Sequence, residues 1–191
     1  LPAKRTWLPV SGSLLLSAIC LASTASAKVS WERTYGGTGE DRGSSIQQTS
    51  DGGFIVCGAT THLLGGNYDV YLIKTNAVGD TLWTRTCGGT RDDDGYSVQQ
   101  TTDGGYIVAG TTRSFGAGAC DVYLIRTDAS GDTLWTRTYG GSKDDRSNCI
   151  RQTSDGGYIV AGWTYSFGAG GHDVYLIKAD AEGDTLWTKT Y

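Results

Sequence analysis

Short apolar runs, separated by turns rich in glycine and aspartate, recur along this chain at a fixed interval. The tryptophans make the interval explicit, because Trp31, Trp83, Trp135 and Trp187 lie 52 residues apart. The runs DVYLI and GDTLW recur three times each at the same spacing. Self-similarity at a fixed period is the sequence signature of a repeat architecture, so the chain is predicted to consist of structurally equivalent units.

Each unit contains four strand-like runs, which are clearest in the third copy. A tight turn is predicted between the first two runs, because Asp-Gly-Gly at 155–157 supplies glycines that adopt positive φ angles freely. The two middle runs are continuously apolar rather than alternating, which predicts strands buried on both faces. The four runs are SNCIRQT (147–153), YIVAGWT (158–164), DVYLIKA (173–179) and DTLWTKTY (184–191).

Four antiparallel strands per unit, in sheets buried on both faces, are typical of a β-propeller blade. A solenoid is the alternative, but solenoid repeats are usually shorter and their strands parallel. We therefore predict an all-β propeller with blades at about 41–87, 93–139 and 145–191, preceded by an orphan outer strand at about 28–37. Closed propellers have about four to eight blades, so this chain is expected to be a fragment of a larger propeller. Self-association of identical chains is the other way to close the ring.

The first 27 residues have the features of a secretory signal peptide. Lys4 and Arg5 form a basic segment, an apolar stretch follows at 8–22, and Ala25-Ser26-Ala27 supplies the small residues that signal peptidase requires. The apolar stretch is too short and too interrupted to span a bilayer. We expect cleavage after Ala27 and a secreted or cell-surface protein whose propeller occupies 28–191.

The charge and the cysteine content of the chain argue against nucleic acid, anionic membranes and metal ions as partners. Removing Lys4 and Arg5 from the 16 basic residues leaves 14 against 20 acidic ones, a net charge of −6. A mildly acidic chain without a basic stripe argues against binding nucleic acid or anionic membrane. Four cysteines remain, at different places in the repeat and without the spacing of metal ligands, so structural or incidental thiols and no metal site are expected. They are Cys57, Cys87, Cys120 and Cys149.

The candidate site consists of one repeated carboxylate. Asp41, Asp93 and Asp145 lie in the loop before the inner strand of successive blades. In a propeller these loops share one face, so the three carboxylates would form a ring near the channel mouth that binds cations or sugar hydroxyls. The competing interpretation is that each aspartate accepts hydrogen bonds from its own loop and fixes the turn.

No catalytic residue or cofactor is predicted. The sequence contains no G-x-S-x-G, H-E-x-x-H or phosphate-binding loop motif. His62 and His172 lie at non-equivalent positions beside glycine-rich loops, where solvent-facing side chains are expected. The repeated aromatic residues inside strands, such as Trp83 and Trp135, are expected to pack between blades rather than to form a platform for glycans.

The motifs GDTLWTRTYGG (131–141), DGGYIVAG (103–110) and DVYLI resemble the bacterial secreted β-propeller repeat of the SBBP type. The resemblance covers Trp31 to Tyr191. It implies large exported or surface-anchored bacterial proteins, often with a C-terminal sorting or anchoring domain, and no known activity or fixed functional residues. TDASGDTLW (127–135) is more loosely similar to pyrroloquinoline-quinone-type propellers, but the cysteine pair and calcium-binding carboxylates of those enzymes are not visible.

The expected function is therefore that of an exported, non-catalytic propeller repeat protein, a binding or structural module at the cell surface or outside the cell. Its expected partners are a glycan or protein ligand and the blades that complete the ring. The alternative is part of a secreted propeller enzyme, a hydrolase or quinone-type oxidoreductase, whose catalytic residues lie outside this chain.

Overall fold

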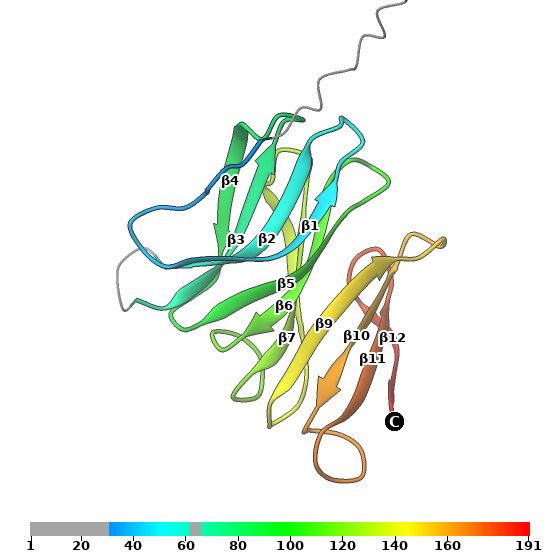
Figure 1. Cartoon of the computed structure of the whole chain (residues 1–191). Helices are drawn as coiled ribbons and strands as arrows, with labels where there is room; N and C mark the ends of the chain where they lie inside the picture. The colour runs from blue at the N-terminus through cyan, green and yellow to red at the C-terminus, as the bar shows by residue number, and fades with distance from the viewer. Residues whose placement is uncertain (1–30, 62–65) are drawn as a thin grey trace, which may run out of the picture. The chain divides into compact units, whose positions relative to one another are not determined.

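The computed structural model describes residues 31–61 and 66–191 (Figure 1). Its regular structure is entirely β, with twelve strands in three four-stranded antiparallel sheets. Within these two ranges no helix is long and apolar enough to cross a membrane. The predicted signal peptide at 1–27 and His62 lie outside the described residues.

Each sheet is formed by one copy of the repeat, with its strands side by side in chain order. The predicted all-β fold of four-stranded, 52-residue blades is confirmed. Blade 1 contains β1 (Asp41–Gln48), β2 (Phe54–Thr61), β3 (Tyr68–Thr75) and β4 (Thr81–Cys87); blade 2 contains β5 (Asp93–Gln100), β6 (Tyr106–Thr112), β7 (Asp121–Thr127) and β8 (Thr133–Tyr139); blade 3 contains β9 (Asp145–Gln152), β10 (Tyr158–Thr164), β11 (Asp173–Ala179) and β12 (Thr185–Thr190).

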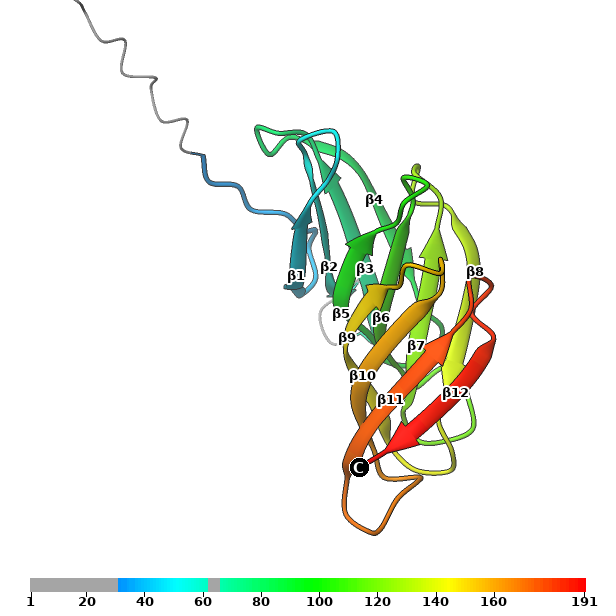
Figure 2. The ribbon, with the colours of Figure 1, turned by 90° about the vertical axis from the view of Figure 1, so that its right-hand side faces the viewer.

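The first strand of each blade lies at the inner edge. β1 contacts β5 and β5 contacts β9, and Figure 2 shows the three strands following one another along the same edge. β5 also packs on β2 and β3 of blade 1, and β9 packs on β6 and β7 of blade 2. The three blades therefore follow one another as consecutive blades of a propeller, and they do not close a ring.

The apolar core lies between the sheets. One cluster joins side chains of β2 and β3 to those of β5, β6 and β7, and a second joins β6 and β7 to β9, β10 and β11. Every residue of β6 and β7 is buried, which confirms the prediction from their continuous apolar runs. β10 and β11 have the same pattern but are only partly buried, because no sheet covers their far side in the described chain.

The repeated tryptophans pack between blades, as predicted. Trp83 of blade 1 meets Tyr106 of blade 2 edge to face at 5.7 Å, and Trp135 meets Tyr158 at 5.9 Å. Trp187 is 41% exposed on the outer strand of blade 3. These contacts favour packing over a glycan platform at the first two positions.

The DGG turn is fixed by its aspartate. Asp103 Oδ1 accepts hydrogen bonds from the hydroxyl of Thr101 at 2.6 Å and from the backbone N–H of Gly105 at 3.3 Å. Gly104 has a φ of +88°, the left-handed region that glycine enters without strain. Asp103 also pairs with Arg126, whose side chain is 6% exposed. The equivalent pairs in the other blades are Lys74 with Asp51 and Lys178 with Asp155.

The segment predicted as an orphan outer strand lies beside blade 1 without forming a strand. Trp31 packs edge to face on Phe54 at 5.8 Å, and the Tyr35 hydroxyl donates to the carbonyl of Gly79 at 2.7 Å. Tyr139, at the end of β8, donates in the same way to Gly183 of the next blade. Residues 31–35 thus take the place of an outer strand, but no neighbouring strand in the described chain supplies hydrogen bonds to them.

Candidate functional site

The structure places the three predicted carboxylates at equivalent positions. Asp41, Asp93 and Asp145 are the first residues of β1, β5 and β9, so they lie at the same end of the inner strands. Asp93 and Asp145 are completely buried. Asp41 is half-buried, because no preceding sheet covers it among the described residues.

The buried carboxylates are bonded to their own surroundings. Asp145 Oδ2 accepts hydrogen bonds from the N–H of Gly141 at 2.7 Å and from the hydroxyl of Ser166 at 2.6 Å. Its Oδ1 accepts a bond from the hydroxyl of Thr164. The geometry therefore favours the loop-fixing interpretation over a ligand-binding ring. Asp93 Oδ2 accepts the equivalent bonds from the Gly89 N–H and the Ser114 hydroxyl, both at 2.7 Å, while Asp93 Oδ1 has no hydrogen-bond partner among the described residues.

A second repeated aspartate approaches each buried carboxylate. A Cβ added to Gly140 would overlap a carboxylate oxygen of Asp121 and lie 2.6 Å from one of Asp145, so only glycine fits between them. Burial and the negative charge of Asp145 raise the pKa of Asp121, although the N–H of Gly118 opposes the shift. No group of three or more His, Cys, Asp or Glu residues in 31–61 and 66–191 is arranged to hold a metal ion.

A neutral polar groove lies at the opposite end of the inner strands. Its volume is about 460 Å³, and all three blades contribute to it through the ends of β1, β5 and β9 and the turns that follow. Amides, hydroxyls and backbone line it, and no lining side chain is charged. The lining residues are Gln47, Ser50, Gln99, Gln100, Thr101, Thr102, Gly104, Gln152, Thr153 and Ser154.

Hydrogen bonds between blades fix the orientation of two amides in this groove. Gln47 Oε1 accepts from the backbone N–H of Gln100 at 2.6 Å, and Gln99 Oε1 accepts from that of Gln152 at 2.8 Å. A backbone N–H can only donate, so the oxygen of each amide must face it and the Nε2 donor must point elsewhere. Neither Nε2 group donates a hydrogen bond within the part of the chain that the structure describes. Both donors are therefore held in place and available.

Arg151 occupies the third equivalent position. Together with Gln47 and Gln99 it lines an adjoining hollow of about 170 Å³ along the inner strands. Its Nη1 donates to the carbonyl of Ile150 at 2.6 Å, and its exposed guanidinium forms no ion pair among residues 31–61 and 66–191. The three equivalent positions thus present available N–H donors, two neutral and one cationic.

His172 is exposed, as expected for a loop histidine, but its ring is not isolated. It packs on Trp163 at 5.6 Å and on Tyr165 at 5.5 Å between ring centroids. The guanidinium of Arg146 lies over the Trp163 ring at 5.4 Å. Blade 2 has Thr111, Arg113 and Cys120 at the positions of the three rings, so the cluster belongs to blade 3 alone.

The four described cysteines are free thiols. Burial raises the pKa of Cys57 to about 12, so its thiol stays protonated at neutral pH and is a poor nucleophile.

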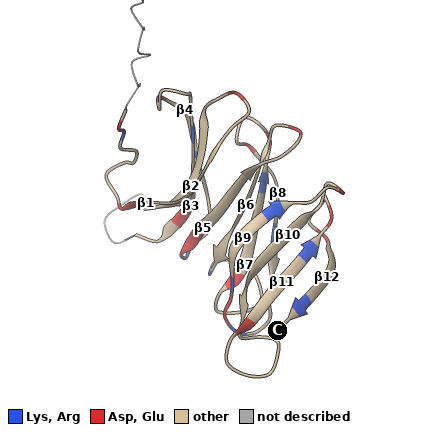
Figure 3. Cartoon of the chain, turned by 45° about the vertical axis from the view of Figure 1, so that its right-hand side comes forward, with Lys and Arg blue, Asp and Glu red and all other residues tan. Residues whose placement is uncertain are grey.

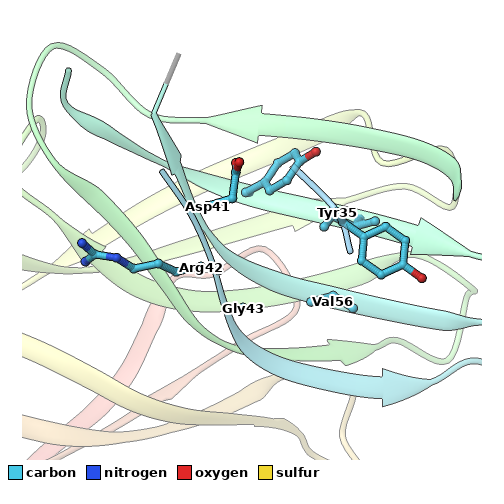
Figure 4. Close-up of a pocket in the computed structure, with 8 residues that line it drawn as sticks. Tyr35, Asp41, Arg42, Gly43 and Val56 are labelled. Atoms are coloured by element: carbon cyan, nitrogen blue, oxygen red, sulfur yellow. The ribbon is translucent and has the colours of Figure 1, made fainter. Parts of the chain in front are cut away.

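A small apolar cavity of about 100 Å³ lies on the open face of blade 1 (Figure 4). Its lining includes Tyr35, Val56 and Tyr71. Figure 4 shows that the Arg42 side chain extends away from Asp41. Val108 and Tyr123, the equivalents of Val56 and Tyr71 in blade 2, are buried by blade 1. The cavity is therefore an uncovered blade-to-blade face rather than a separate ligand site.

The DGG turns predict a loss of stability in acid. Hydrogen bonds from Thr153, Lys178 and the N–H of Gly157 lower the pKa of Asp155 from 3.8 to about 2. The folded chain thus binds this proton more weakly than the unfolded chain, so the stabilisation is present above pH 3.8 and is lost as the pH falls to about 2. Urea unfolding across this range should show a shallower loss for Asp155→Asn than for the wild type.

The matched control is Ser154→Ala, which removes a neighbouring exposed side chain without changing a titrating group. It should keep the pH slope of the wild type. Parallel slopes for Asp155→Asn and the wild type would contradict the prediction.

Comparisons with known proteins place few limits on function. No model of a known protein family matches the chain. Regulatory protein FlaEY of Caulobacter vibrioides is 29% identical to it over an alignment of 140 residues, and the alignment covers 62% of this chain. The aligned region covers 15% of the length of that relative. The likeness therefore leaves most of the relative outside the comparison.

The sequence pattern predicted a site of repeated carboxylates and did not predict the groove. A pair of glutamines at the end of a strand forms no recognised motif, and its role depends on which backbone N–H faces it. One signal was available, because Arg151 breaks the repeat at the position of Gln47 and Gln99.

Proposed function

We propose that this protein is an exported, non-catalytic β-propeller repeat protein that acts as a binding or structural module at the cell surface or outside the cell. The observation that carries the proposal is the polar groove at the a-to-b turns, meaning the turns between the first and second strands of the blades. There, amide donors remain available, whereas both oxygens of the buried Asp145 carboxylate at the other end of the inner strands accept hydrogen bonds from their own surroundings.

Export is supported by the basic, apolar and small-residue segments within residues 1–27. Expression of the full chain in a bacterial host tests it directly. N-terminal sequencing of the extracytoplasmic product should begin at Lys28. Retention of an uncleaved chain in the cytoplasm would contradict the proposal.

A binding screen separates this function from the enzyme alternative. The full chain is applied to arrays of glycans and of extracellular proteins, beside the variant Gln99→Glu. That change keeps an oxygen for the N–H of Gln152 and removes the Nε2 donor from the groove. We expect at least one ligand to bind the wild type and to bind the variant less. Turnover of a hydrolase or quinone-oxidoreductase substrate, abolished by changing one unrepeated residue, would favour the enzyme.

A further inference from the structure

We propose that the groove and the hollow that adjoins it bind an acidic, hydroxyl-rich glycan, a uronate-containing oligosaccharide, and that Arg151 in the hollow receives a carboxylate of this ligand. The inference rests on the proposed binding function and names the class of ligand. Its starting point is the row of equivalent positions 47, 99 and 151, which line one hollow and present N–H donors.

The donors suit a ligand rich in oxygen acceptors. Gln47 and Gln99 have their amide oxygens bonded to the backbone of the next blade, so only their Nε2 groups are available to a ligand. Because the oxygens are fixed by bonds between blades, little side-chain entropy is lost when a ligand binds. Ligand carbonyl, carboxylate or hydroxyl oxygens can accept from these groups.

In every blade, a residue with a hydroxyl group lies three positions after the donor residue at position 47, 99 or 151. Three equivalent residues line the groove, and each directly precedes the aspartate of its DGG turn. They are Ser50, Thr102 and Ser154. Their hydroxyls make no hydrogen bond to any part of the chain that the structure describes. A hydroxyl both donates and accepts, which matches the hydroxyl groups of a sugar.

Arg151 supplies the preference for an acid. Figure 3 shows a basic position near the end of β9, where this residue lies. A guanidinium binds a carboxylate through two parallel N–H···O bonds, and Arg151 has N–H groups left after its one bond to Ile150. One cation among neutral donors fits a glycan that presents one carboxylate to Arg151 and hydroxyl groups to the amide donors.

The neighbouring carboxylates do not oppose an acidic ligand. The DGG turns carry Asp51, Asp103 and Asp155 close to the groove, and each is paired with a lysine or arginine of its own blade. Nucleic acid is a poorer fit, because its backbone needs several cationic contacts and the chain has a net charge of −4.

Calorimetric titration of the full chain tests the proposal with three uronate probes, namely oligogalacturonate, oligomannuronate and hyaluronan fragments. Each probe is compared with its methyl-esterified form, which removes the charge and keeps the sugar. Arg151→Gln installs the residue that the other two blades carry, so it preserves the fold. We expect this variant to bind the best acidic probe about tenfold or more weakly, with little change for the esterified form.

Two further variants test whether the affinity for acidic probes depends on the charge at position 151 and on the amide donor of Gln99. Arg151→Lys keeps the charge and should restore part of the affinity, and Gln99→Glu should weaken acidic binding because it replaces a donor with a negative charge. Thermal unfolding monitored by circular dichroism confirms that each variant folds.

Several outcomes overturn the inference. Equal affinity for the acidic and esterified probes, unchanged in Arg151→Gln, would refute the acidic ligand and leave the binding module standing. Tighter binding of oligoglutamate or a single-stranded oligonucleotide would assign the groove to another class of ligand. Failure of all three uronates would reject the proposal, whereas failure of every ligand in the wider screen would reject the binding function as well.

Discussion

Replacement of Asp145 by alanine lowers the free energy of unfolding by about 4 kcal/mol, because it leaves one buried and two partly buried donors without an acceptor. The carboxylate is completely buried and accepts bonds from the Gly141 N–H and from the hydroxyls of Ser166 and Thr164. Thr164 is buried, and Gly141 and Ser166 are partly buried, so water can replace the lost oxygens only in part. The measurement is urea unfolding of the full chain at neutral pH.

The repeat itself provides the control. Asp41 is the equivalent residue of blade 1, where it is half-buried and accepts from the N–H of Gly37 and the hydroxyl of Thr60. Asp41→Ala should therefore destabilise the chain by about 1–2 kcal/mol, since solvent can compensate in part. Equal losses for the two variants would contradict the loop-fixing role, as would binding of a cation that disappears only in Asp145→Ala.

The second large effect is expected at the last glycine of DGGYIVAG. Gly110 lies inside β6, opposite the bulge where the pairing of β5 shifts between Gly95 and Ser97. A Cβ at Gly110 would overlap the backbone carbonyl oxygen of Asp94. Since a carbonyl inside a sheet cannot rotate away, Gly110→Ala should destabilise the chain by about 3 kcal/mol.

Gly104 in the same motif is the matched comparison. Its φ of +88° favours glycine, but an added Cβ would meet no atom within 4 Å. Asparagine tolerates this backbone region better than most residues, so Gly104→Asn should change stability by about 1 kcal/mol or less. A larger loss at Gly104 than at Gly110 in thermal unfolding would show that turn conformation, rather than close packing of the strands, decides the motif.

The fold was largely predictable because the repeat reports each strand three times. The run YIVAGWT coincides with β10 (Tyr158–Thr164), and DVYLIKA coincides with β11 (Asp173–Ala179). Residues 31–35 (WERTY) differ from the equivalent outer-strand residues 135–139 (WTRTY) at one position, yet they form no strand. A strand requires a hydrogen-bonding neighbour, so the local sequence could place this segment against blade 1 but could not make it a strand.

The candidate site was only partly predictable. The sequence shows that Asp93 and Asp145 recur, but not that both side chains are completely buried. Gln99 is one of two adjacent glutamines, and only the pairing of blades 2 and 3 shows which backbone N–H its oxygen accepts. Such contacts join residues about one repeat apart in the chain, and a sequence alone does not specify their geometry.

The position of the apolar core has a consequence for how such a chain grows by duplication. Each core cluster is shared by two consecutive sheets, so a single sheet has no interior of its own. Duplication of one 52-residue repeat therefore adds one complete interface between two sheets. This holds whichever of the four strands the duplicated segment begins with. A copy that fits its neighbour, as Trp83 fits against Tyr106 and Trp135 against Tyr158, therefore brings its own core contacts with it.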